Sequence, residues 1–550
     1  MNIGIICPKY VNKGQTYVFN LALATTSAWI KQHGYNVVCL NPNHYDEDIV
    51  VQVTRFVKEN GIDIVYVEDT FVWHRQIREI FDTVKKIDSR IVTIAGGTIV
   101  TRKPDIGFWG IKTIDLGIIG EVEETIIELL EMIEGKNTNP VNGTSCYDPS
   151  TNKYILMEPR RALPNLDTLP IPDYEGFKYG KYMELFYPSE NHFYSVLDEV
   201  RVGNIMGSRS CPFKCNFCYL HGTAIGNRYR QRSMDHIFRE IDYLVEKYNI
   251  NFLNTYDLLF SVGKDRLYEF AKRIKKYNIK WWAQIRVPDV DEDLLKTLKD
   301  AGMFQASYGI ESIDENILHS MGKHITVEQI EHALELTYRT KINIQGNIII
   351  GDMEDTKESV EKSLEWLKKN WKYGLNLVMI RTHPFSPQYM YAVEKGIITD
   401  QFEHLNNVFP LVNCSKMSNK DYESVSVYSE NYSDDPRYFY HGEVMESCVD
   451  HGYTLKIKCQ NCGTINEYRH MHRKSFKTFF KVICRDCHVH LRVENLKAYG
   501  IEYSILDRVM SIVIRELKTR VNSNRVLHQM YCMVKKMKNN GIIKVSEKYV

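Results

Sequence analysis

Seven of the thirteen cysteines lie in two tight clusters, and these clusters restrict the possible folds more than any other feature of the sequence. The first cluster spans residues 211–218, and the second consists of two Cys-x-x-Cys pairs at residues 459–462 and 484–487. The apolar run at the start of the chain is too short for a secretory signal peptide. Clustered cysteines in a chain without such a signal are expected to bind metal rather than to form disulfides.

The charge balance limits the classes of partner. Of 550 residues, 70 are Lys or Arg and 69 are Asp or Glu, so the net charge is +1. A chain this close to neutral is not expected to bind nucleic acid in general, although residues 501–550 form a basic, helical tail. No uninterrupted run of about 18 apolar residues occurs, so we expect a cytoplasmic protein without a membrane span.

Hydrophobic patterning divides the chain into four regions and predicts an α/β protein. Residues 1–135 alternate apolar strands with amphipathic helices, which predicts a doubly wound parallel sheet of the Rossmann or flavodoxin-like type. Residues 136–199 are rich in Pro and Asn and are predicted to be a linker. Six strand–helix units over residues 200–395 predict a partial (β/α)6 barrel of the TIM type. Residues 396–550 form a carboxy-terminal region with a four-cysteine module, resembling a zinc ribbon, over residues 455–495.

Cys211, Cys215 and Cys218 are predicted to hold a [4Fe-4S] cluster. They follow the first strand of the predicted barrel, at the end of the barrel where active sites lie. A four-iron cluster needs four ligands, so three thiolates leave one iron open to another molecule. An open coordination position is typical of a reactive metal centre. A zinc knuckle, or three buried cysteines, is the structural alternative.

With this motif, residues 200–395 resemble the radical SAM superfamily. The resemblance includes the aromatic residue before the third cysteine, Gly-Ile-Glu-Ser at the end of the fourth strand and Gly-Asn-Ile-Ile-Ile-Gly in the fifth. An arginine after the third strand could hold the S-adenosylmethionine (SAM) carboxylate or could equally form a surface salt bridge. The SAM contacts that the resemblance implies are Phe217, Arg286, Glu311, Ser312, Asn347 and Ile348.

The resemblance to this superfamily implies a chemistry. The open iron would bind the amino and carboxylate groups of SAM, and an electron from the cluster would break a carbon–sulfur bond. The resulting 5′-deoxyadenosyl radical would remove a hydrogen atom from a small-molecule or natural-product-intermediate substrate. An external one-electron reductant of the flavodoxin or ferredoxin type would supply the electron. The sequence assigns no catalytic residue.

A doubly wound domain before a radical SAM barrel resembles the cobalamin-binding arrangement of the class B radical SAM enzymes. Two segments carry this match, Ala-Gly-Gly-Thr after the fourth strand and Gly-Glu-Val-Glu before the next helix. Valine replaces the second glycine of the usual Gly-Glu-Gly-Glu segment. The loop that supplies a histidine to cobalt in other cobalamin domains is absent, so no histidine ligand is expected. The cobalamin contacts that the resemblance implies are Gly96, Gly97, Thr98, Gly120 and Glu121.

These resemblances predict a cobalamin-dependent radical SAM methyltransferase that methylates an unactivated carbon. One alternative is an enzyme that uses cobalamin for cyclisation or oxidative rearrangement without methyl transfer. Another is a tRNA-modifying, methylthiotransferase-like protein. Such enzymes carry a second cluster on three amino-terminal cysteines, whereas here only Cys7 and Cys39 precede residue 140 and Cys146 lies in the predicted linker. A different class, a nucleic-acid-directed protein, would use the four-cysteine module and the basic tail to bind RNA.

Cys459, Cys462, Cys484 and Cys487 are predicted to hold one structural zinc ion. Paired Cys-x-x-Cys knuckles at this spacing are typical of tetrahedral thiolate coordination. All four positions would be filled by protein, so the site would be closed. An auxiliary iron–sulfur cluster is the alternative.

Overall fold

We describe the fold from a computed structural model. It describes residues 1–101, 107, 110–148, 150–151, 153–189, 193–220, 228–260, 262–407, 409–450, 452–471 and 479–494. The predicted basic tail over residues 501–550 lies outside these residues. No helix of the described part of the chain is both long enough and apolar enough to cross a membrane.

The chain forms two compact units, each assembled from segments distant in sequence. The first consists of Met1–Leu185, Asn204–Tyr243 and Arg381–Val412. The second consists of Phe186–Gly203, Leu244–Ile380 and Asn413–Val550.

The first unit is built on a seven-stranded sheet with the order β2-β1-β3-β4-β5-β6-β7. Strands β1 to β5 pair in parallel with their neighbours. The hairpin of β6 and β7 adds to the edge of β5 in antiparallel orientation. The strands are β1 (Asn2–Ile6), β2 (Asn36–Leu40), β3 (Ile64–Glu68), β4 (Val92–Gly96), β5 (Leu116–Ile118), β6 (Thr144–Asp148) and β7 (Lys153–Leu156).

The hairpin of β6 and β7 lies in the range that the sequence places in a linker. It extends the sheet because the edge strand β5 leaves its outer backbone groups free to pair, with Gly117 opposite Ser145 and Leu116 opposite Cys146.

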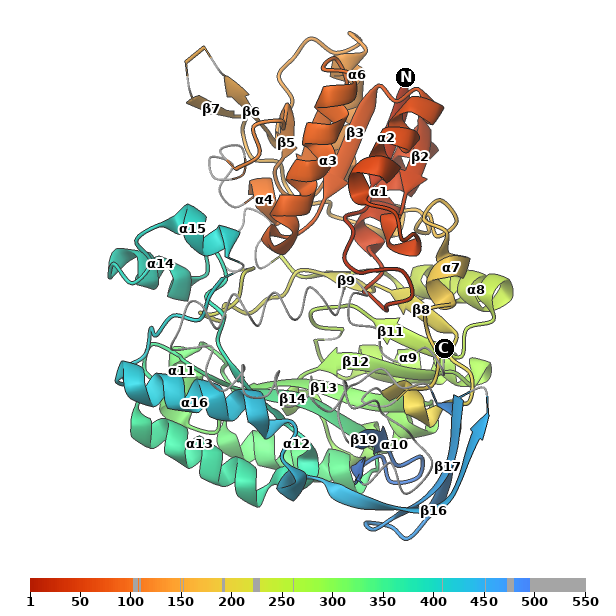
Figure 1. Cartoon of the computed structure of the whole chain (residues 1–550), viewed down its shortest axis with the longest axis vertical. Helices are drawn as coiled ribbons and strands as arrows, with labels where there is room; N and C mark the ends of the chain where they lie inside the picture. Colours follow the sequence, from red (N-terminus) through yellow and green to blue (C-terminus); the bar gives the residue numbers. More distant parts are fainter. Residues whose placement is uncertain are drawn as a thin grey trace. The chain divides into compact units, whose positions relative to one another are not determined.

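Helices flank the first sheet, as Figure 1 shows. Helices α2 and α3 pack together over a core that includes Val65 and Val67 of β3. Helices α1 and α6 contact each other instead, as expected when helices cover both faces of a parallel sheet. The helices of this unit are α1 (Leu21–Gln32), α2 (Ile49–Asn60), α3 (His74–Ile87), α4 (Thr98–Thr101), α6 (Glu123–Ile133), α7 (Tyr179–Met183), α14 (Pro387–Glu394) and α15 (Gln401–Asn406).

Local sequence explains why these helices begin and end where they do. The Asp48 side chain caps α2 by accepting a hydrogen bond from the Val50 N–H, and the helix ends at Gly61 with φ +55°. A short antiparallel pair, β9 (Ser208–Arg209) and β10 (Arg230–Gln231), precedes helix α8 (Met234–Tyr248).

The second sheet has six strands in the order β15-β14-β13-β12-β11-β8. Strands β11 to β15 pair in parallel with their neighbours. The strands are β8 (Val202–Ile205), β11 (Phe252–Thr255), β12 (Lys280–Ile285), β13 (Met303–Glu311), β14 (Asn343–Ile350) and β15 (Asn376–Met379). The predicted α/β class with parallel sheets is therefore confirmed.

Each of the strands β11 to β15 is followed by a helix, and α12 and α13 lie beside β13 and β14 in Figure 1. Thr326 and Thr356 begin these two helices with capping boxes, in which the threonine and the third helical residue exchange hydrogen bonds. The helices are α9 (Asp265–Ile274), α10 (Glu292–Asp300), α11 (Glu315–Ser320), α12 (Val327–Arg339), α13 (Lys357–Lys369) and α16 (Asn419–Tyr432).

A five-stranded module ends the described chain, with the order β18-β17-β16-β20-β19. Its buried core includes Tyr453, Leu455, Ile457, Tyr468 and Leu491. Its strands are β16 (Tyr440–Asp450), β17 (Gly452–Cys459), β18 (Ile465–Met471), β19 (Phe480–Ile483) and β20 (His490–Val493).

Candidate functional site

A cavity of about 280 Å³ lies in the first unit, where its parallel strands end. Glu68 is the last residue of β3, and the loops after β4 and β5 supply further wall residues. Ligands of open α/β sheets bind at this edge. The wall also includes Leu21, Ala22, Thr25 and Thr26 of α1, and Leu166, Leu169, Pro170 and Pro172.

Four of the five predicted cobalamin contacts line this cavity, namely Gly97, Thr98, Gly120 and Glu121. The fifth, Gly96, ends β4, where an added Cβ would lie 2.2 Å from the Tyr66 hydroxyl oxygen. Gly97 has φ +78°, and its Cβ would lie 2.3 Å from the Asp69 carbonyl oxygen. Protein packing between the ends of β3 and β4 therefore already requires both glycines.

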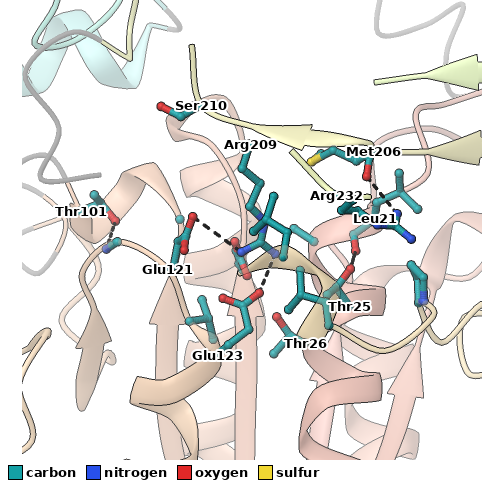
Figure 2. A pocket seen from close by; sticks show the side chains of 18 of the residues that line it. Leu21, Thr25, Thr26, Thr101, Glu121, Glu123, Met206, Arg209, Ser210 and Arg232 are labelled. Carbon is teal, nitrogen blue, oxygen red and sulfur yellow. Dashed lines mark hydrogen bonds and ion pairs between the residues drawn. The ribbon is translucent and has the colours of Figure 1, made fainter. Parts of the chain in front are cut away.

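Two buried ion pairs join the cavity to the segment that carries the first cysteine cluster. Arg230 makes two hydrogen bonds to the Glu121 carboxylate, at 2.9 and 2.6 Å. The Arg209 guanidinium donates to Glu123 Oε1 at 2.6 Å and points toward both carboxylates (Figure 2). Bidentate pairs of this kind fix direction as well as distance. They hold strands β9 and β10 against the loop after β5.

Glu123 has an unused hydrogen-bond acceptor at the cavity wall. The residue is 3% exposed, and no group of the described chain hydrogen-bonds its Oε2. Burial alone would raise the pKa of Glu123, but the charge of Arg209 holds that pKa below its ordinary value. The carboxylate is therefore charged, and its free oxygen suits a ligand that carries N–H donors.

Glu68 contributes an acid of a different character. It accepts a hydrogen bond of 2.7 Å from the Tyr66 hydroxyl, while burial raises its pKa to about 7. Near neutral pH this carboxyl exists in both protonation states and can donate or accept a hydrogen bond. Glu68 was not predicted as a site residue. An acidic residue at the end of the apolar strand Ile-Val-Tyr-Val-Glu could have indicated it.

The three cysteines of the first cluster follow β9 directly. Cys211, Cys215 and Cys218 are partly exposed, and the Cys218 N–H donates to the Cys215 carbonyl at 3.1 Å. The loop begins at Ser210, which has φ +67°. Ser210 and the two residues after Cys218, Tyr219 and Leu220, line the cavity. The cysteine loop and the cavity are thus neighbours within one unit.

The predicted SAM contacts other than Phe217, which lies in the cysteine loop, are in the second unit. Glu311 ends β13 with φ +67°, pairs in register with Ile348, and makes an ion pair of 3.2 Å with Lys323. Buried Ser312 accepts a hydrogen bond from the Asp314 N–H through its side chain.

Two further predicted SAM contacts have polar partners in the same unit. The Asn347 side-chain oxygen accepts a hydrogen bond of 3.2 Å from Asn376. Arg286 makes an ion pair of 3.8 Å with Asp289, which is the salt-bridge alternative that the sequence left open.

The cysteines that a methylthiotransferase-like protein would need are too far apart for one cluster. Cys39 lies in β2 and Cys146 in β6, with β1, β3, β4 and β5 between them in the sheet. Five steps of about 4.8 Å separate these strands by roughly 24 Å. Cys7 is buried, and burial raises the pKa of its thiol. These three residues therefore do not form a metal site together.

The second cysteine cluster comes together as predicted from its spacing. The four sulfur atoms of Cys459, Cys462, Cys484 and Cys487 all lie within 4.8 Å of one another.

Comparison with known proteins identifies the central part of the chain. Residues 205–367 match the Radical SAM superfamily. This range contains the first cysteine cluster and all six predicted SAM contacts.

Curated relatives cover more of the chain. An uncharacterized methyltransferase of Pyrococcus horikoshii is 28% identical over 350 residues, which are 63% of this chain and 72% of the relative. The anaerobic magnesium-protoporphyrin IX monomethyl ester cyclase of Rubrivivax gelatinosus is 24% identical over 427 residues, or 75% of this chain and 73% of that enzyme.

Two solved structures share the fold. One is the radical S-adenosylmethionine methyltransferase TsrM of Kitasatospora setae with tryptophan and a SAM analogue bound. It has a TM-score of 0.57 and 18% identity over 72% of this chain and 76% of that protein. The other is the cobalamin-dependent SAM radical enzyme OxsB with aqua-cobalamin and SAM bound, with a TM-score of 0.57 and 14% identity over 98% of this chain and 71% of OxsB.

Proposed function

Because the chain belongs to the radical SAM superfamily, we propose that it is a cobalamin-dependent methyltransferase that methylates an unactivated carbon of a small molecule. The observation that carries this proposal is the cavity of the first unit, which the cysteine loop borders through Ser210, Tyr219 and Leu220. A methyl carrier and a radical generator must act on one substrate, so their sites need to adjoin. The methyltransferase relative of Pyrococcus horikoshii and the fold shared with TsrM and OxsB support it.

In this proposal Cys211, Cys215 and Cys218 hold a [4Fe-4S] cluster with one open iron. Their partial exposure and the turn between Cys215 and Cys218 fit three thiolates that converge on an inorganic cluster. When bound, the cluster supplies the electron that cleaves SAM and so starts hydrogen removal from the substrate. A flavodoxin or ferredoxin would reduce it. The six predicted contacts of the SAM molecule are Phe217, Arg286, Glu311, Ser312, Asn347 and Ile348.

The cavity residues fit a corrin ring with amide side chains. Glu123 Oε2 is a buried, charged acceptor without a partner in the described chain, which suits an amide N–H. Leu21 and Ala22 of α1 and the two prolines give the cavity an apolar wall, as ligand sites commonly have. When bound, cobalamin supplies a transferable methyl group. Gly97, Thr98, Gly120 and Glu121 would contact it, and Gly96 would shape the loop.

We also propose the finer domain architecture. Residues 1–135 would be the cobalamin-binding domain, and residues 136–199 a linker whose hairpin of β6 and β7 extends the sheet of that domain. Residues 200–395 would be a partial (β/α)6 barrel and residues 396–550 a region with a zinc-ribbon-like module. The parallel pairing of β11 to β15 supports the barrel. We propose no role in binding nucleic acid.

The first experiment tests the radical chemistry. Anaerobically reconstituted protein should be brown and should release 5′-deoxyadenosine from SAM after reduction, whereas Cys215→Ala should lose both properties. Cys414→Ala is the matched control, because Cys414 is buried and lies outside both clusters. Absence of 5′-deoxyadenosine from the reconstituted, reduced protein contradicts the proposal.

The second experiment tests the cavity. Ala22 is exposed on α1 and lines the cavity, so Ala22→Trp should fill it without disturbing the core. Hydroxocobalamin should co-elute with the unaltered protein from a desalting column, and Ala22→Trp should reduce the bound fraction at least tenfold. Gln32→Trp, at the exposed end of the same helix, should retain cobalamin. Equal retention by both variants would place cobalamin elsewhere.

The similarity to a cyclase favours a second candidate, cobalamin chemistry without methyl transfer. Turnover with deuterated-methyl SAM separates the two, because only methyl transfer adds the labelled group to the product. An unlabelled product with fewer hydrogens would support cyclisation or oxidation.

A further inference from the structure

The cluster of four cysteines in the carboxy-terminal module has the dimensions of a site for a single metal ion. The sulfurs of Cys459 and Cys487 lie 3.8 Å apart, and those of Cys462 and Cys484 lie 3.7 Å apart. A tetrahedral zinc ion with bonds of about 2.3 Å separates its sulfurs by roughly 3.8 Å. A four-iron cluster binds each thiolate through a different iron and so requires wider spacing. A disulfide would bring two sulfurs to about 2.05 Å.

We propose that these four thiolates bind one Zn²⁺, and that the ion holds the carboxy-terminal module on the amino edge of the six-stranded sheet. The inference goes beyond the proposed methyltransferase function and does not depend on it. It is carried by three observations: the sulfur spacing, the groups around the sulfurs and the place where the module docks.

The groups around the sulfurs are arranged for charged thiolates. The side-chain amides of Asn461 and Asn466 each donate a hydrogen bond of 3.4 Å, to Cys487 Sγ and Cys484 Sγ respectively. The Gly463 N–H donates to the Cys459 carbonyl at 2.8 Å, and Gly463 has φ +76°, as a tight knuckle requires. Amide donors of this kind orient the thiolates that bind the metal and stabilise their negative charge.

The module docks where strands of the sheet begin. Asn343, the first residue of β14, donates a hydrogen bond of 2.9 Å to the His488 carbonyl, and its amide nitrogen lies 3.2 Å from His490 Nε2. Near the start of β13, the Phe304 ring lies 4.7 Å from the His488 ring. Lys341, just before β14, pairs with Asp486 at 3.1 Å. These contacts tie the segment around the second cysteine pair to the sheet.

This position separates the ion from the edge where ligands bind. Strand β13 runs from Met303 at the amino edge to Glu311 at the carboxyl edge, and its nine residues span about 26 Å. All four coordination positions are filled by protein, and Cys459 and Cys484 are fully buried. A closed site so far from Glu311 can stabilise the module but cannot activate a ligand at that edge.

The module needs such an ion because its own core is small. Its buried core cluster consists of twelve residues, and three of these are Cys459, Cys484 and Cys487, so without metal three thiols would occupy part of this core. Small domains of this size are commonly stabilised by a structural metal. In such sites metal binding and folding are coupled.

Metal analysis of the full chain tests the proposal. Anaerobically purified protein should contain one zinc per chain, and X-ray absorption should show sulfur ligands at about 2.3 Å. Cys462→Ser should lose the zinc. The variant with Cys211, Cys215 and Cys218 all changed to Ala should lose iron but keep the zinc, which excludes adventitious zinc at the first cluster. The proposal is overturned if the triple alanine variant loses the zinc while Cys462→Ser keeps it, or if Cys462→Ser loses iron.

Two further variants guard against simple misfolding. Cys462→His preserves four ligands and should retain at least half of the zinc, with an absorption spectrum of three sulfurs and one nitrogen. Asn343→Ala removes the docking hydrogen bonds but no ligand, so it should keep the zinc while residues 479–494 are digested several-fold faster by protease. Unchanged digestion of Asn343→Ala would show that the module does not rely on this edge. Zinc that still has four sulfur ligands in Cys462→His would contradict metal coordination by Cys462.

Discussion

Residues around the cavity of the first unit combine charges that are separated by long stretches of sequence. Arg230 and Glu121 lie 109 residues apart in the chain and form a bidentate pair. Removing one partner of such a pair leaves the other charge buried, which typically costs about 3 to 5 kcal/mol. The pairs therefore constrain the loop that precedes the cysteines, while burial raises the pKa of Glu68, beside them, to about 7.

Glu68 should make the stability of the protein depend on pH. Its pKa is raised to about 7 in the folded state, so between pH 4.5 and 7 the folded state binds more protons than the unfolded state. The contribution of Glu68 to the free energy of unfolding is therefore full at low pH. It is lost as the pH rises through 7, and the total loss is about 3 kcal/mol. Glu68→Gln should remove this dependence of stability on pH. The difference in thermal midpoint, variant minus unaltered protein, should therefore increase by several degrees as the pH is raised from 5 to 8.

Thermal melts of both proteins at each pH unit measure this difference. Glu59→Gln, an exposed substitution on α2, should melt in parallel with the unaltered protein. A difference between Glu68→Gln and the unaltered protein that stays constant with pH would show that Glu68 is charged throughout.

Elements of the two sheets position the chemistry through their strand ends. In the first unit, β3 and β4 end side by side, and the chain then turns at Gly97 against the Asp69 carbonyl. In the second unit, Glu311 of β13 and Ile348 of β14 lie in register. Parallel strands bring their carboxyl ends to one edge, so residues far apart in sequence become neighbours there.

Gly97→Ala should disrupt the turn after β4. The new Cβ would meet the Asp69 carbonyl at 2.3 Å, and φ +78° is unfavourable for alanine. Gly34→Ala isolates the second effect, because Gly34 has φ +85° but no atom within 4 Å of the added Cβ. We expect Gly34→Ala to lower the free energy of unfolding by about 1 to 2 kcal/mol. The decrease in thermal midpoint should be at least twice as large for Gly97→Ala as for Gly34→Ala. Equal shifts would mean that the loop after β3 can move away.

The whole molecule consists of two units that would bind different cofactors. Unit one contains the cavity, the first cysteine cluster and the predicted SAM contact Phe217. Unit two contains the other five predicted SAM contacts and the four-cysteine module. A ligand stabilises the state that binds it, by about 2.7 kcal/mol at a hundredfold excess over the dissociation constant. Each cofactor should therefore protect its own unit most.

Hydrogen exchange followed by mass spectrometry should show this division. Hydroxocobalamin should slow exchange in α1 and in the loops after β4 and β5, whereas removal of zinc should speed exchange in β17, β18 and β20. The unaltered protein with neither treatment is the reference. Faster exchange in α1 on zinc removal, equal to that in β17, would contradict two separately stabilised units.

Much of the fold follows from local patterns. The alternation over residues 1–135 predicts a parallel sheet, and β1 to β5 do pair in parallel. The hairpin of β6 and β7 was not predicted, because Pro and Asn around it hide a pairing that only the free edge of β5 explains. The partners of Arg209 and Arg230 were also missed, because no local period marks a long-range ion pair.

Sequence alone predicted that the two cysteine clusters bind metal, because their ligands are close neighbours in the chain and their spacing restricts what they can bind. Tertiary structure alone decided where that chemistry can act. It brought α1, three loops and the cysteine segment around one cavity, and it seated the four-cysteine module where strands begin. The physical reason is that ligand spacing is a property of a few adjacent residues, whereas a cavity and a docking edge exist only once distant strands have paired.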